Sequence, residues 1–577
     1  MDSLRDARPA AWVALALVAF GWIAGGFQSY ELGLYVIYGI ATQGVALCWG
    51  RLGFLSLGNA LFFGMGAYLC GAVMKAAALH PGWYAALPLA LLLPALLAYV
   101  VARLLFARTT RSGPYFALVT LALTMLGYLV AQQWSGVTGG YNGMLGIPSL
   151  PGFDRYGNLY WVVVCAAVAS TWLLSTLLAR PLGIAWSAIS QHEPRMQLYG
   201  YATDRMKAWA FALSALLAAL AGCLFAWQQG LVTPQSIGFG LSTDFVIWAA
   251  VGGKSSPVGA LLGAVGIGYA SMLMRQHFGE WEVVVGAVFI AVVLYLPQGL
   301  AGIWQRRGGR QAPSAPDLDA PPAAAAAAPL RLELRDVHAA QGGVRILDGL
   351  SLSLDGPGIR SVIGPNGAGK TSTFNAVVGQ LRLQRGAIML DGSDIAGLEP
   401  WRVARRGIGR KFQVPTVFAQ LSVADNLRLA LWAGRLRGTA WLGRRALRWR
   451  SDLLEELRRL FPVLAQQSQR SAGELSQGQR QALEFAMTVL PEPRLLLLDE
   501  PCAGLSPAET AHMAQAIRAV VARIGAAALL IEHDISAVAA MGGEVFVLHQ
   551  GALLARGELA AIQAEPAVRA VYAGGSK

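Results

Sequence analysis

The chain has 577 residues, of which 55% are hydrophobic and only 14% are charged, and its mean hydropathy is +0.47. Soluble globular proteins carry about 25% charged residues, so this composition argues against a wholly water-soluble chain. The length also exceeds one ordinary domain. The net charge of +13 would suit nucleic-acid binding, but basic cytoplasmic loops of a membrane protein produce the same excess, and we favour that explanation. The five cysteines form no CxxC pair and no cluster with histidine, so a disulfide framework or zinc site has no support.

Apolar stretches near bilayer length follow one another through the first three hundred residues. The first stretch follows Arg5 and Arg8, as a signal peptide would, but the many later stretches favour a retained spanning helix. Residues 236–274 fit one long helix or two short ones, and we predict two because both flanking segments must be cytoplasmic. The ten predicted spans are 10–27, 32–49, 55–76, 84–106, 114–133, 159–179, 208–228, 236–252, 257–274 and 283–303.

Basic residues in the short loops predict the orientation of these spans. Arginine and lysine concentrate in the loops at 103–111 and 180–207 and again after the last span, so these segments are predicted to be cytoplasmic. The segment 134–158 carries only Arg155 and is predicted to lie outside. Two helices within 236–274 then place Lys254 inside.

The composition changes twice in the second half of the chain. Residues 308–329 are rich in Ala, Pro and Gly and predict a linker, because they lack the large apolar side chains of a core. Beyond them, β-branched and leucine-rich runs alternate with amphipathic helices, which is typical of an α/β domain. We therefore predict a multi-domain chain, with an all-α polytopic membrane bundle at 1–307, the linker at 308–329 and an α/β domain at 330–577.

Residues 364–371 read GPNGAGKT and fit the phosphate-binding loop G-x-x-x-x-G-K-[ST]. A strand-like segment, 360–363, precedes the loop and a helical segment, 370–378, follows it, as phosphate binding requires. The glycines let backbone N–H groups close around phosphates, while Lys370 pairs with them and Thr371 offers its hydroxyl to Mg²⁺. The residues predicted to hold ATP here are Gly364, Pro365, Asn366, Gly367, Ala368, Gly369, Lys370, Thr371 and Ser372.

Two adjacent acids, Asp499 and Glu500, follow a leucine run that reads as a buried strand. In isolation they would be interpreted as a solvated pair at the end of a strand. Behind a phosphate loop they predict a catalytic pair, with Asp499 holding Mg²⁺ through water and Glu500 polarising the attacking water. Their presence argues against the alternative that residues 364–371 are a chance glycine-rich turn.

Further motifs resemble those of ATP-binding-cassette (ABC) ATPases, in that family's order and spacing, from about residue 330 to the end of the chain. Residues 475–479 (LSQGQ) resemble the signature motif, and Gln413 stands at the position of the Q-loop. Residues 503–506 stand at the D-loop, and His533 stands at the switch histidine, although a lone histidine is more often a packed core residue. The resemblance implies a P-loop ABC ATPase with a helical subdomain.

That family pairs two such domains head to tail around two ATP molecules, so the resemblance implies that Ser476 and Gly478 cap a phosphate held by a second ATPase. Many members also stack an aromatic residue on adenine ahead of the phosphate loop. Residues 338–343 of this chain contain no Tyr, Phe or Trp, so this segment is not expected to stack on adenine. The choice of ATP rather than GTP is therefore implied by the family resemblance alone. The implied catalytic residues are Glu500, His533 and Gln413, and the implied Mg²⁺ ligands are Thr371, Gln413 and Asp499.

The membrane part resembles the permeases of the branched-chain amino acid and urea importer family over nearly all of residues 1–305. Several glycines within a span permit bent or interrupted helices along a substrate path, and close helix packing is the alternative for any one of them. The motifs that carry the resemblance are residues 50–53 (GRLG), 56–58 (SLG), 64–68 (GMGAY), 112–116 (SGPYF), 138–143 (TGGYNG) and 296–299 (LPQG).

The cytoplasmic loop 181–207 stands where this family has its coupling helix, which contacts a groove of the ATPase near the Q-loop. A short amphipathic helix flanked by charges is the form such a contact takes. We predict that Ile184, Trp186, Glu193 and Gly200 form this contact and that the loop transmits ATP-driven closure to the pore.

These features predict an ABC importer subunit that couples ATP hydrolysis to uptake of a small polar nutrient, either a branched-chain amino acid or urea and short amides. The family implies a second permease, a second ATPase and an extracytoplasmic substrate-binding protein, in a bacterial inner membrane with the ATPase in the cytoplasm. One alternative is an ABC half-exporter, a class similar in length whose members have six longer helices that extend into the cytoplasm. The other is an ATP-gated channel or non-transport ATPase. The arginine-rich stretch 435–450 predicts a solvated or lipid-facing helix rather than a nucleic-acid interface.

Overall fold

The computed structural model describes residues 8–108, 113–275, 279, 281–296, 298–305, 318–322 and 330–573. Contacts divide the chain into a membrane unit, residues 1–190 and 203–311, and an ATPase unit, residues 191–202 and 312–577. The membrane unit is thus interrupted by a short segment that folds with the other unit. Apart from residues 318–322, the predicted linker at 308–329 lies outside the described residues.

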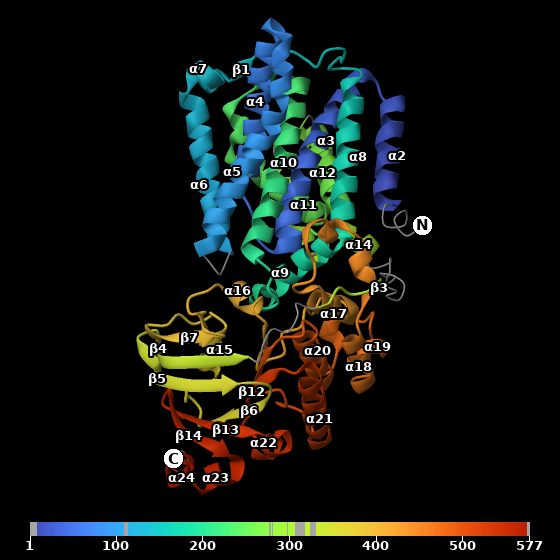
Figure 1. The fold of residues 1–577 in the computed structure, drawn as a ribbon. Helices are drawn as coiled ribbons and strands as arrows, with labels where there is room; N and C mark the ends of the chain where they lie inside the picture. The colour runs from blue at the N-terminus through green and yellow to red at the C-terminus, as the bar shows by residue number, and fades with distance from the viewer. Residues whose placement is uncertain are drawn as a thin grey trace. The chain divides into compact units, whose positions relative to one another are not determined.

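The membrane unit consists almost entirely of helices in its described residues (Figure 1). A two-stranded ribbon of β1 (Met144–Leu145) and β2 (Leu231–Val232) connects two of its loops. The helices are α2 (Arg8–Ile23), α3 (Gly26–Ala46), η1 (Leu47–Arg51), α4 (Asn59–Leu79), η2 (Pro81–Ala86), α5 (Leu87–Arg108), α6 (Pro114–Gln133), α7 (Ser135–Thr138), η3 (Gly140–Asn142), α8 (Leu159–Leu178), α9 (Pro181–Leu198, of which the end belongs to the ATPase unit), α10 (Thr203–Gln229), η4 (Pro234–Ile237), α11 (Phe239–Gly252), α12 (Pro257–Arg275), α13 (Trp281–Tyr295) and α14 (Ala301–Gln305).

Each of the ten predicted spans lies mainly on a different α-helix of this unit. Within the described residues, seven helical stretches are long and apolar enough to cross a membrane. Three further apolar helices, at 11–23, 239–252 and 283–292, are shorter. The pair α11 and α12 is separated at residues 253–256, so the two-helix interpretation of residues 236–274 is confirmed. The unit is therefore a polytopic helical bundle, as predicted.

Close backbone contact between α4 and α10 depends on glycine. A Cβ atom built on Gly222 of α10 would lie 2.0 Å from the carbonyl oxygen of Phe63, and one on Gly66 of α4 would lie 2.5 Å from that of Ala219. Carbonyl oxygens of a helix backbone cannot move aside as a flexible side chain can. In lipid, small residues that let backbones approach closely are a main source of helix association.

Replacing Gly222 with alanine is therefore expected to lower the melting temperature of the detergent-purified chain by several degrees, because overpacking costs about 1–3 kcal/mol. Gly266 of α12 provides the matched control, because a Cβ there meets no atom within 4 Å. The Gly266→Ala variant is expected to melt within about one degree of the parent, given the small cost of an unhindered helix substitution. Equal melting temperatures for the two variants would contradict the close-packing explanation.

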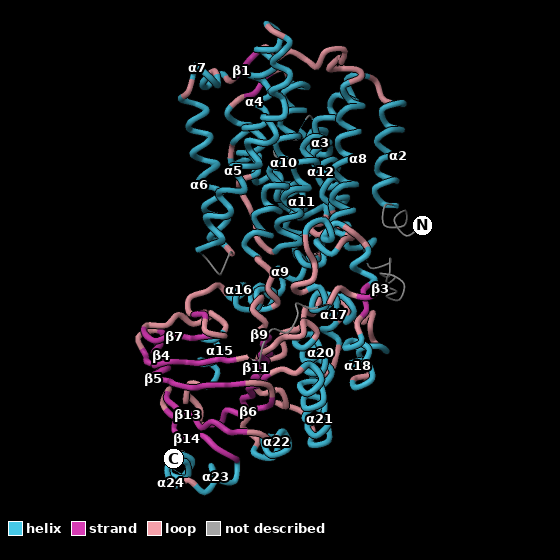
Figure 2. Tube along the Cα trace, in the orientation of Figure 1, coloured by secondary structure: helices cyan, strands magenta, loops and turns pink. Residues whose placement is uncertain are grey.

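The ATPase unit is built on two sheets (Figure 2). A six-stranded sheet has the order β14-β13-β6-β12-β11-β9, with every neighbouring pair parallel except β13 and β14. An antiparallel four-stranded sheet has the order β5-β4-β7-β8. The strands are β4 (Arg331–Gln341), β5 (Val344–Asp355), β6 (Gly358–Ile363), β7 (Arg385–Leu390), β8 (Ser393–Asp394), β9 (Ile408–Lys411), β11 (Leu495–Asp499), β12 (Ala527–Ile531), β13 (Glu544–His549) and β14 (Ala552–Glu558).

Helices surround and extend these sheets, and one buried apolar core joins both sheets to α15 through residues such as Leu334, Phe374 and Leu529. Helices α20 and α21 each begin after an N-cap serine. Ser476 and Ser506 each form a reciprocal capping box with the residue three positions further along the chain. The helices are α15 (Lys370–Val377), α16 (Pro400–Ala404), α17 (Val423–Trp432), α18 (Asp452–Leu460), α19 (Val463–Gln466), α20 (Gln477–Val489), α21 (Pro507–Ile524), α22 (Ile535–Met541), α23 (Leu559–Ala564) and α24 (Pro566–Ala573), with short 3₁₀ turns η5 (Gly438–Leu442), η6 (Arg445–Arg448) and η7 (Ala472–Glu474).

The parallel strands of the larger sheet gather the functional segments at one edge. Strands β11 and β12 are buried along their whole length, which explains their unbroken apolar sequences. Because the strands run in the same direction, the segments after β6, β9, β11 and β12 leave from the same edge of the sheet. Ligands of α/β proteins bind at this edge, beyond the carboxyl ends of the strands.

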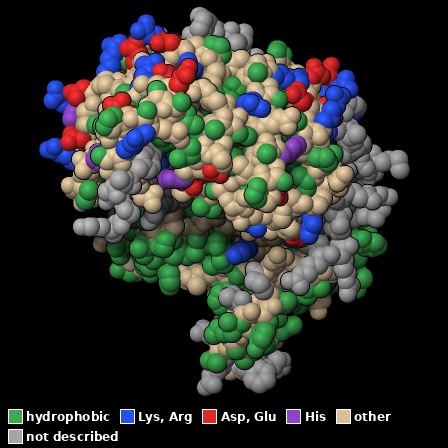
Figure 3. Space-filling view, turned by 90° about the horizontal axis from the view of Figure 1, so that it is seen from below, with side chains coloured by type: hydrophobic (Ala, Val, Ile, Leu, Met, Phe, Trp, Pro, Cys, Tyr) green, Lys and Arg blue, Asp and Glu red, His purple; other side chains and the backbone are tan. Residues whose placement is uncertain are grey.

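The arginine-rich stretch 435–450 is not one helix, and that prediction was wrong. It folds as η5, η6 and the two-residue strand β10 (Trp449–Arg450), which pairs in parallel with β3 (Leu318–Asp319). Arg435 is buried and donates to Glu492 at 2.6 Å and to the carbonyl oxygen of Pro321 at 3.0 Å. Figure 3 shows basic side chains interspersed with acidic ones on the face seen from below.

Candidate functional site

The phosphate loop, residues 364–369, connects the end of β6 to the start of α15. Gly369 caps α15 in a left-handed conformation (φ 94°), and a Cβ there would lie 2.9 Å from the carbonyl oxygen of Ile346. A Cβ on Gly364 would lie 2.2 Å from the carbonyl oxygen of Leu548. Only glycine therefore fits at these two positions, and the first N–H groups of α15 are left facing the loop, where they favour an anion.

Lys370 is the first residue of α15, and its side chain turns back into the loop. Its Nζ donates to the carbonyl oxygens of Gly364 at 2.8 Å and Pro365 at 3.0 Å. Burial lowers the pKa of Lys370, and the nearby carboxylates of Glu500 and Asp499 oppose part of that change. The ammonium group thus lies between the loop and the two acids, where it can pair with a phosphate.

Glu500 is the point at which the predicted catalytic residues meet. Nε2 of Gln413 donates to Oε1 of Glu500 at 2.9 Å, and Nε2 of His533 lies 3.0 Å from the same oxygen. The backbone of Glu500 is left-handed (φ 44°), which is uncommon for a residue with a side chain, and its N–H donates to the carbonyl oxygen of Ile531 at 2.9 Å. The strand ends thus hold an amide and an imidazole against the same carboxylate oxygen, an arrangement that can orient a water molecule.

Asp499 lies beside this cluster as a buried carboxylate. Neither of its oxygens receives a hydrogen bond from the described residues. Burial raises the pKa of Asp499, and the Arg410 guanidinium offsets part of this rise; the Thr371 hydroxyl lies near enough to lower the pKa too, although it is not placed to donate a hydrogen bond. A carboxylate with open lone pairs beside a hydroxyl is the kind of oxygen set that Mg²⁺ prefers. Gln413 uses its amide nitrogen on Glu500, so only its amide oxygen could ligate a cation.

Ser476 and Gly478 lie at the start of α20 and pack against the D-loop segment of the same chain. A Cβ on Gly478 would lie 2.8 Å from Oε1 of Glu509 and 3.4 Å from the side chain of Leu505. The Gln481 side chain donates to the carbonyl oxygen of Ala503 at 3.3 Å. The signature motif and the D-loop therefore form one surface of the ATPase unit.

The segment 191–202 folds with the ATPase unit, although the membrane helices flank it on both sides. Helix α9 is kinked at His192 (φ −154°, ψ 84°), two residues before Pro194, and the boundary between the units falls at this kink. A proline inside a helix removes a hydrogen bond and crowds the preceding turn, which accounts for the break. Of the four predicted contact residues, Glu193 and Gly200 lie in this segment, while Ile184 and Trp186 are buried in the membrane unit.

Two further residues of this segment, Arg195 and Tyr201, contact the ATPase core although the sequence did not predict it, and the predicted Gly200 does so as well. Arg195 forms an ion pair with Glu484 of α20. Oη of Tyr201 donates to the carbonyl oxygen of Leu429 at 2.6 Å, and Nε of Arg405 donates to that of Gly200 at 2.8 Å. No local pattern announces these contacts, because their partners lie more than two hundred positions away in the chain.

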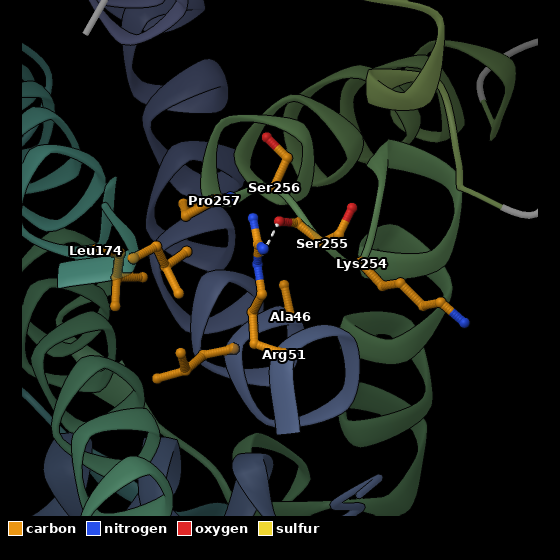
Figure 4. Close-up of a pocket in the computed structure, with 9 residues that line it drawn as sticks. Ala46, Arg51, Leu174, Lys254, Ser255, Ser256 and Pro257 are labelled. Atoms are coloured by element: carbon orange, nitrogen blue, oxygen red, sulfur yellow. Dashed lines mark hydrogen bonds between the residues drawn. The ribbon is translucent and has the colours of Figure 1, made fainter. Parts of the chain in front are cut away.

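The membrane unit contains a small pocket at the turn between α11 and α12 (Figure 4). Nε of Arg51, from the π-helical turn η1, donates to the carbonyl oxygen of Ser255 at 3.0 Å. Lys254 points away from the pocket, and its Nζ lies 4.9 Å from the centre of the Trp49 ring. The hydrogen bond from Arg51 therefore links the π-helical end of α3 to the α11–α12 turn, and we interpret the pocket as part of the packing between these segments.

Comparison with known proteins covers both units. Residues 13–293 match the family described as the permease component of branched-chain amino acid transport systems, and residues 347–503 match the ABC transporter family. Over 253 residues the chain is 35% identical to the high-affinity branched-chain amino acid transport ATP-binding protein BraF of Pseudomonas aeruginosa, an alignment that covers 42% of this chain and 97% of BraF.

Over 245 residues the chain is 34% identical to the ATP-binding protein LivG of Escherichia coli, which has the same description, covering 40% of this chain and 93% of LivG. Among solved structures, a nucleotide-free ATP-binding cassette from an ABC transporter aligns at 25% identity with a TM-score of 0.37, covering 42% of this chain and 98% of that one. The chain belongs to the ABC transporters and joins a membrane permease domain of the branched-chain amino acid type to an ATPase domain that hydrolyses ATP to drive transport.

Proposed function

We propose that this chain is the fused permease and ATPase subunit of an importer for branched-chain amino acids. The observation that carries the proposal is the pairing, in one chain, of a branched-chain amino acid type permease domain with an ATPase domain 35% identical to BraF. BraF and LivG are both described as branched-chain amino acid transport ATP-binding proteins. Urea and short amides, which the sequence left open, have no such support and become the competing substrates of the test.

The complete transporter needs further parts. ABC ATPases act in pairs, so we infer a second ATPase, a second permease subunit and an extracytoplasmic substrate-binding protein, in a bacterial inner membrane with the ATPase on the cytoplasmic side. The exposed surface formed by Ser476, Gly478 and the D-loop supports the pairing, because these residues pack together at the start of α20. Within the chain we place the permease domain at 1–307, the linker at 308–329 and the ATPase domain at 330–577.

We assign the ATP site to the sheet edge that holds the phosphate loop. Residues 364–372 hold the phosphates, Lys370 pairs with them, and Ser476 and Gly478 close the equivalent site of a partner ATPase. Glu500 orients the attacking water with Gln413 and His533, an assignment supported by their contacts at one carboxylate oxygen. Thr371, Gln413 and Asp499 would hold Mg²⁺, which supplies charge neutralisation for the phosphates when it is bound.

We also propose that the segment 191–202 couples the ATPase to the pore. Its support is that the segment folds with the ATPase unit while the helices on either side of it belong to the membrane unit. A movement of the ATPase core would therefore act directly on the ends of α9 and α10. Glu193 and Gly200 keep their place in this proposal, and Ile184 and Trp186 serve as the membrane-side anchor.

The test is reconstitution of the purified subunit with its partner proteins in lipid vesicles. Labelled leucine, isoleucine and valine are expected to accumulate inside when ATP is supplied on the ATPase side, and labelled urea and acetamide are not. Accumulation of urea in preference to leucine would contradict the substrate assignment. ATP-driven loss of substrate from preloaded vesicles would contradict the direction.

One prediction concerns adenine binding, since no aromatic residue stands ahead of the loop. Gln341 ends β4 and Val344 begins β5, whose Ile346 contacts the phosphate loop at Gly369, so the hairpin tip flanks the nucleotide site. Base–aromatic stacking contributes about 1–3 kcal/mol, so a Gln341→Tyr variant is expected to bind ATP about fivefold or more tightly by calorimetry. A Gln341→Leu control is expected to gain much less, and equal gains would contradict stacking.

A further inference from the structure

A fully buried carboxylate, Glu484, lies in the middle of α20 at the junction of three chain segments. Its Oε1 accepts hydrogen bonds from the backbone N–H of Thr416 at 3.2 Å and from the Thr416 hydroxyl at 3.0 Å. The same oxygen accepts from Nη1 of Arg195. Its other oxygen lies 3.4 Å from Nζ of Lys411. The side chains of Glu484 and Lys411 are 0% exposed and that of Arg195 is 1% exposed, so this is a charge cluster inside the protein.

Arg195 is held on every side. Nη1 also donates to the Thr416 hydroxyl at 2.8 Å, and Nε donates to the Tyr199 hydroxyl at 2.8 Å. Its guanidinium carbon lies 5.3 Å from the centre of the Tyr199 ring and 5.9 Å from that of Phe412. Arg195 belongs to the segment 191–202, so its guanidinium enters the ATPase core from a segment flanked by membrane helices.

The two partners of Glu484 outside the segment 191–202, Lys411 and Thr416, flank Gln413 of the Q-loop. Lys411 is the last residue of β9, two positions before Gln413, and Thr416 stands three positions after Gln413. Glu484 itself lies eight positions after Ser476, on the helix that Ser476 caps. One carboxylate therefore fixes both ends of the Q-loop segment relative to the helix of the signature motif.

The charges of the cluster show why Arg195 matters to this arrangement. Glu484 and Lys411 alone form a neutral pair, and Arg195 brings a second cation to the same carboxylate. With Arg195 in place, Oε1 is shared between Arg195 and Thr416 while Lys411 lies on Oε2. Without Arg195, Lys411 would be the one remaining cation beside Glu484 among these residues. The carboxylate would then turn toward Lys411, and strand β9, which carries Lys411, would shift relative to α20.

We propose that Glu484 is a positioning residue that receives Arg195 of the segment 191–202 and sets the Q-loop and the signature helix relative to each other for ATP hydrolysis. This inference rests on the proposed coupling role of that segment and deepens it. The position of the segment 191–202 would reach the ATPase core through the ion pair of Arg195 and Glu484.

The test uses the full chain purified with its partner subunits and measures kcat and KM for ATP hydrolysis. In the Arg195→Gln variant the neutral Glu484–Lys411 pair remains, so folding is expected to be retained. Its kcat is expected to fall about tenfold or more with KM for ATP within twofold, because the phosphate loop is untouched. The Glu484→Asp variant keeps the negative charge, but its shorter side chain moves the carboxylate oxygens away from Arg195, Thr416 and Lys411. A similar fall in kcat is expected. The Arg195→Lys variant keeps the cation and is expected to recover part of kcat.

The matched control is Tyr201→Phe, which removes a contact of the same segment to α17 that reaches neither motif. Its kcat is expected to stay within twofold of the parent. A kcat within twofold of the parent for both Arg195→Gln and Glu484→Asp, or an equal fall in Tyr201→Phe, would overturn the inference. Hydrolysis is measured without a transported substrate, so a failure of the import proposal would appear as absent uptake by the parent and leave these ratios unchanged.

Discussion

Replacing Glu500 with glutamine is expected to lower kcat for ATP hydrolysis by about 100-fold or more, since a positioned general base contributes about 10²–10⁴-fold. Glutamine has nearly the same shape, and its amide oxygen can still accept the hydrogen bond from Gln413 and lie against Nε2 of His533. The binding of ATP is therefore expected to remain within about threefold, because the variant removes only the basic oxygen. Steady-state hydrolysis and equilibrium ATP binding measure the two effects separately.

Glu532 provides the control for this experiment, because it is another buried acid at the end of the neighbouring strand β12. Its Oε1 accepts from the backbone N–H of Cys502 at 3.0 Å, and burial raises its pKa. A Glu532→Gln variant can keep that hydrogen bond and is expected to retain most of the parent kcat. If Glu532→Gln lost activity as Glu500→Gln does, or if Glu500→Gln kept the parent rate, the assignment of Glu500 would be wrong.

Replacing Lys370 with methionine is expected to weaken ATP binding by about 10- to 100-fold. Hydrogen bonds to a charged group contribute about 1.5–3 kcal/mol each, and the ammonium is the one side-chain cation at the start of α15. Methionine fills a similar volume, so the loop and helix are expected to persist. Titration with ATP, followed by calorimetry, measures the loss.

The Lys370→Met variant also tests how Lys370 affects the stability of the fold. The pKa of Lys370 is lowered by burial in the fold, so the folded chain binds the proton of this side chain less readily than the unfolded chain does. This effect opposes folding at every pH below the folded pKa and disappears above the unfolded pKa. Without nucleotide, Lys370→Met is therefore expected to be as stable as the parent or more stable. Added ATP is expected to raise the melting temperature of the parent more than that of the variant, because the variant binds ATP less tightly. A large loss of stability without nucleotide would contradict this interpretation.

Much of this molecule could be predicted from its sequence because the signals are local. Each of the ten apolar runs lies mainly on a helix of the membrane bundle, and the break between α11 and α12 was predicted because both flanking segments had to be cytoplasmic. The phosphate loop and the acids after β11 were equally readable, because a fixed spacing of residues builds these sites within one turn or strand end.

The remaining features depend on contacts between distant segments. Gln413 and Glu500 are 87 residues apart, and Arg195 and Glu484 are 289 residues apart, so neither pair has a local pattern. The coupling role of the loop 181–207 stays a prediction, and the sequence could not show where the loop passes from one unit to the other. That boundary depends on the kink at His192 and on which side chains find partners in the ATPase core. The arginine-rich stretch was misinterpreted because a charge run does not reveal that Arg435 is buried against Glu492.

The central claim is that ATP hydrolysed at the sheet edge drives movement of a small solute through the helical bundle of the same chain. The most direct test follows labelled leucine in vesicles that contain the complete complex, with the parent and the Glu500→Gln subunit side by side. We expect accumulation above the outside concentration with the parent and none with the variant. Accumulation by both, or by neither while the parent still hydrolyses ATP, would contradict the claim.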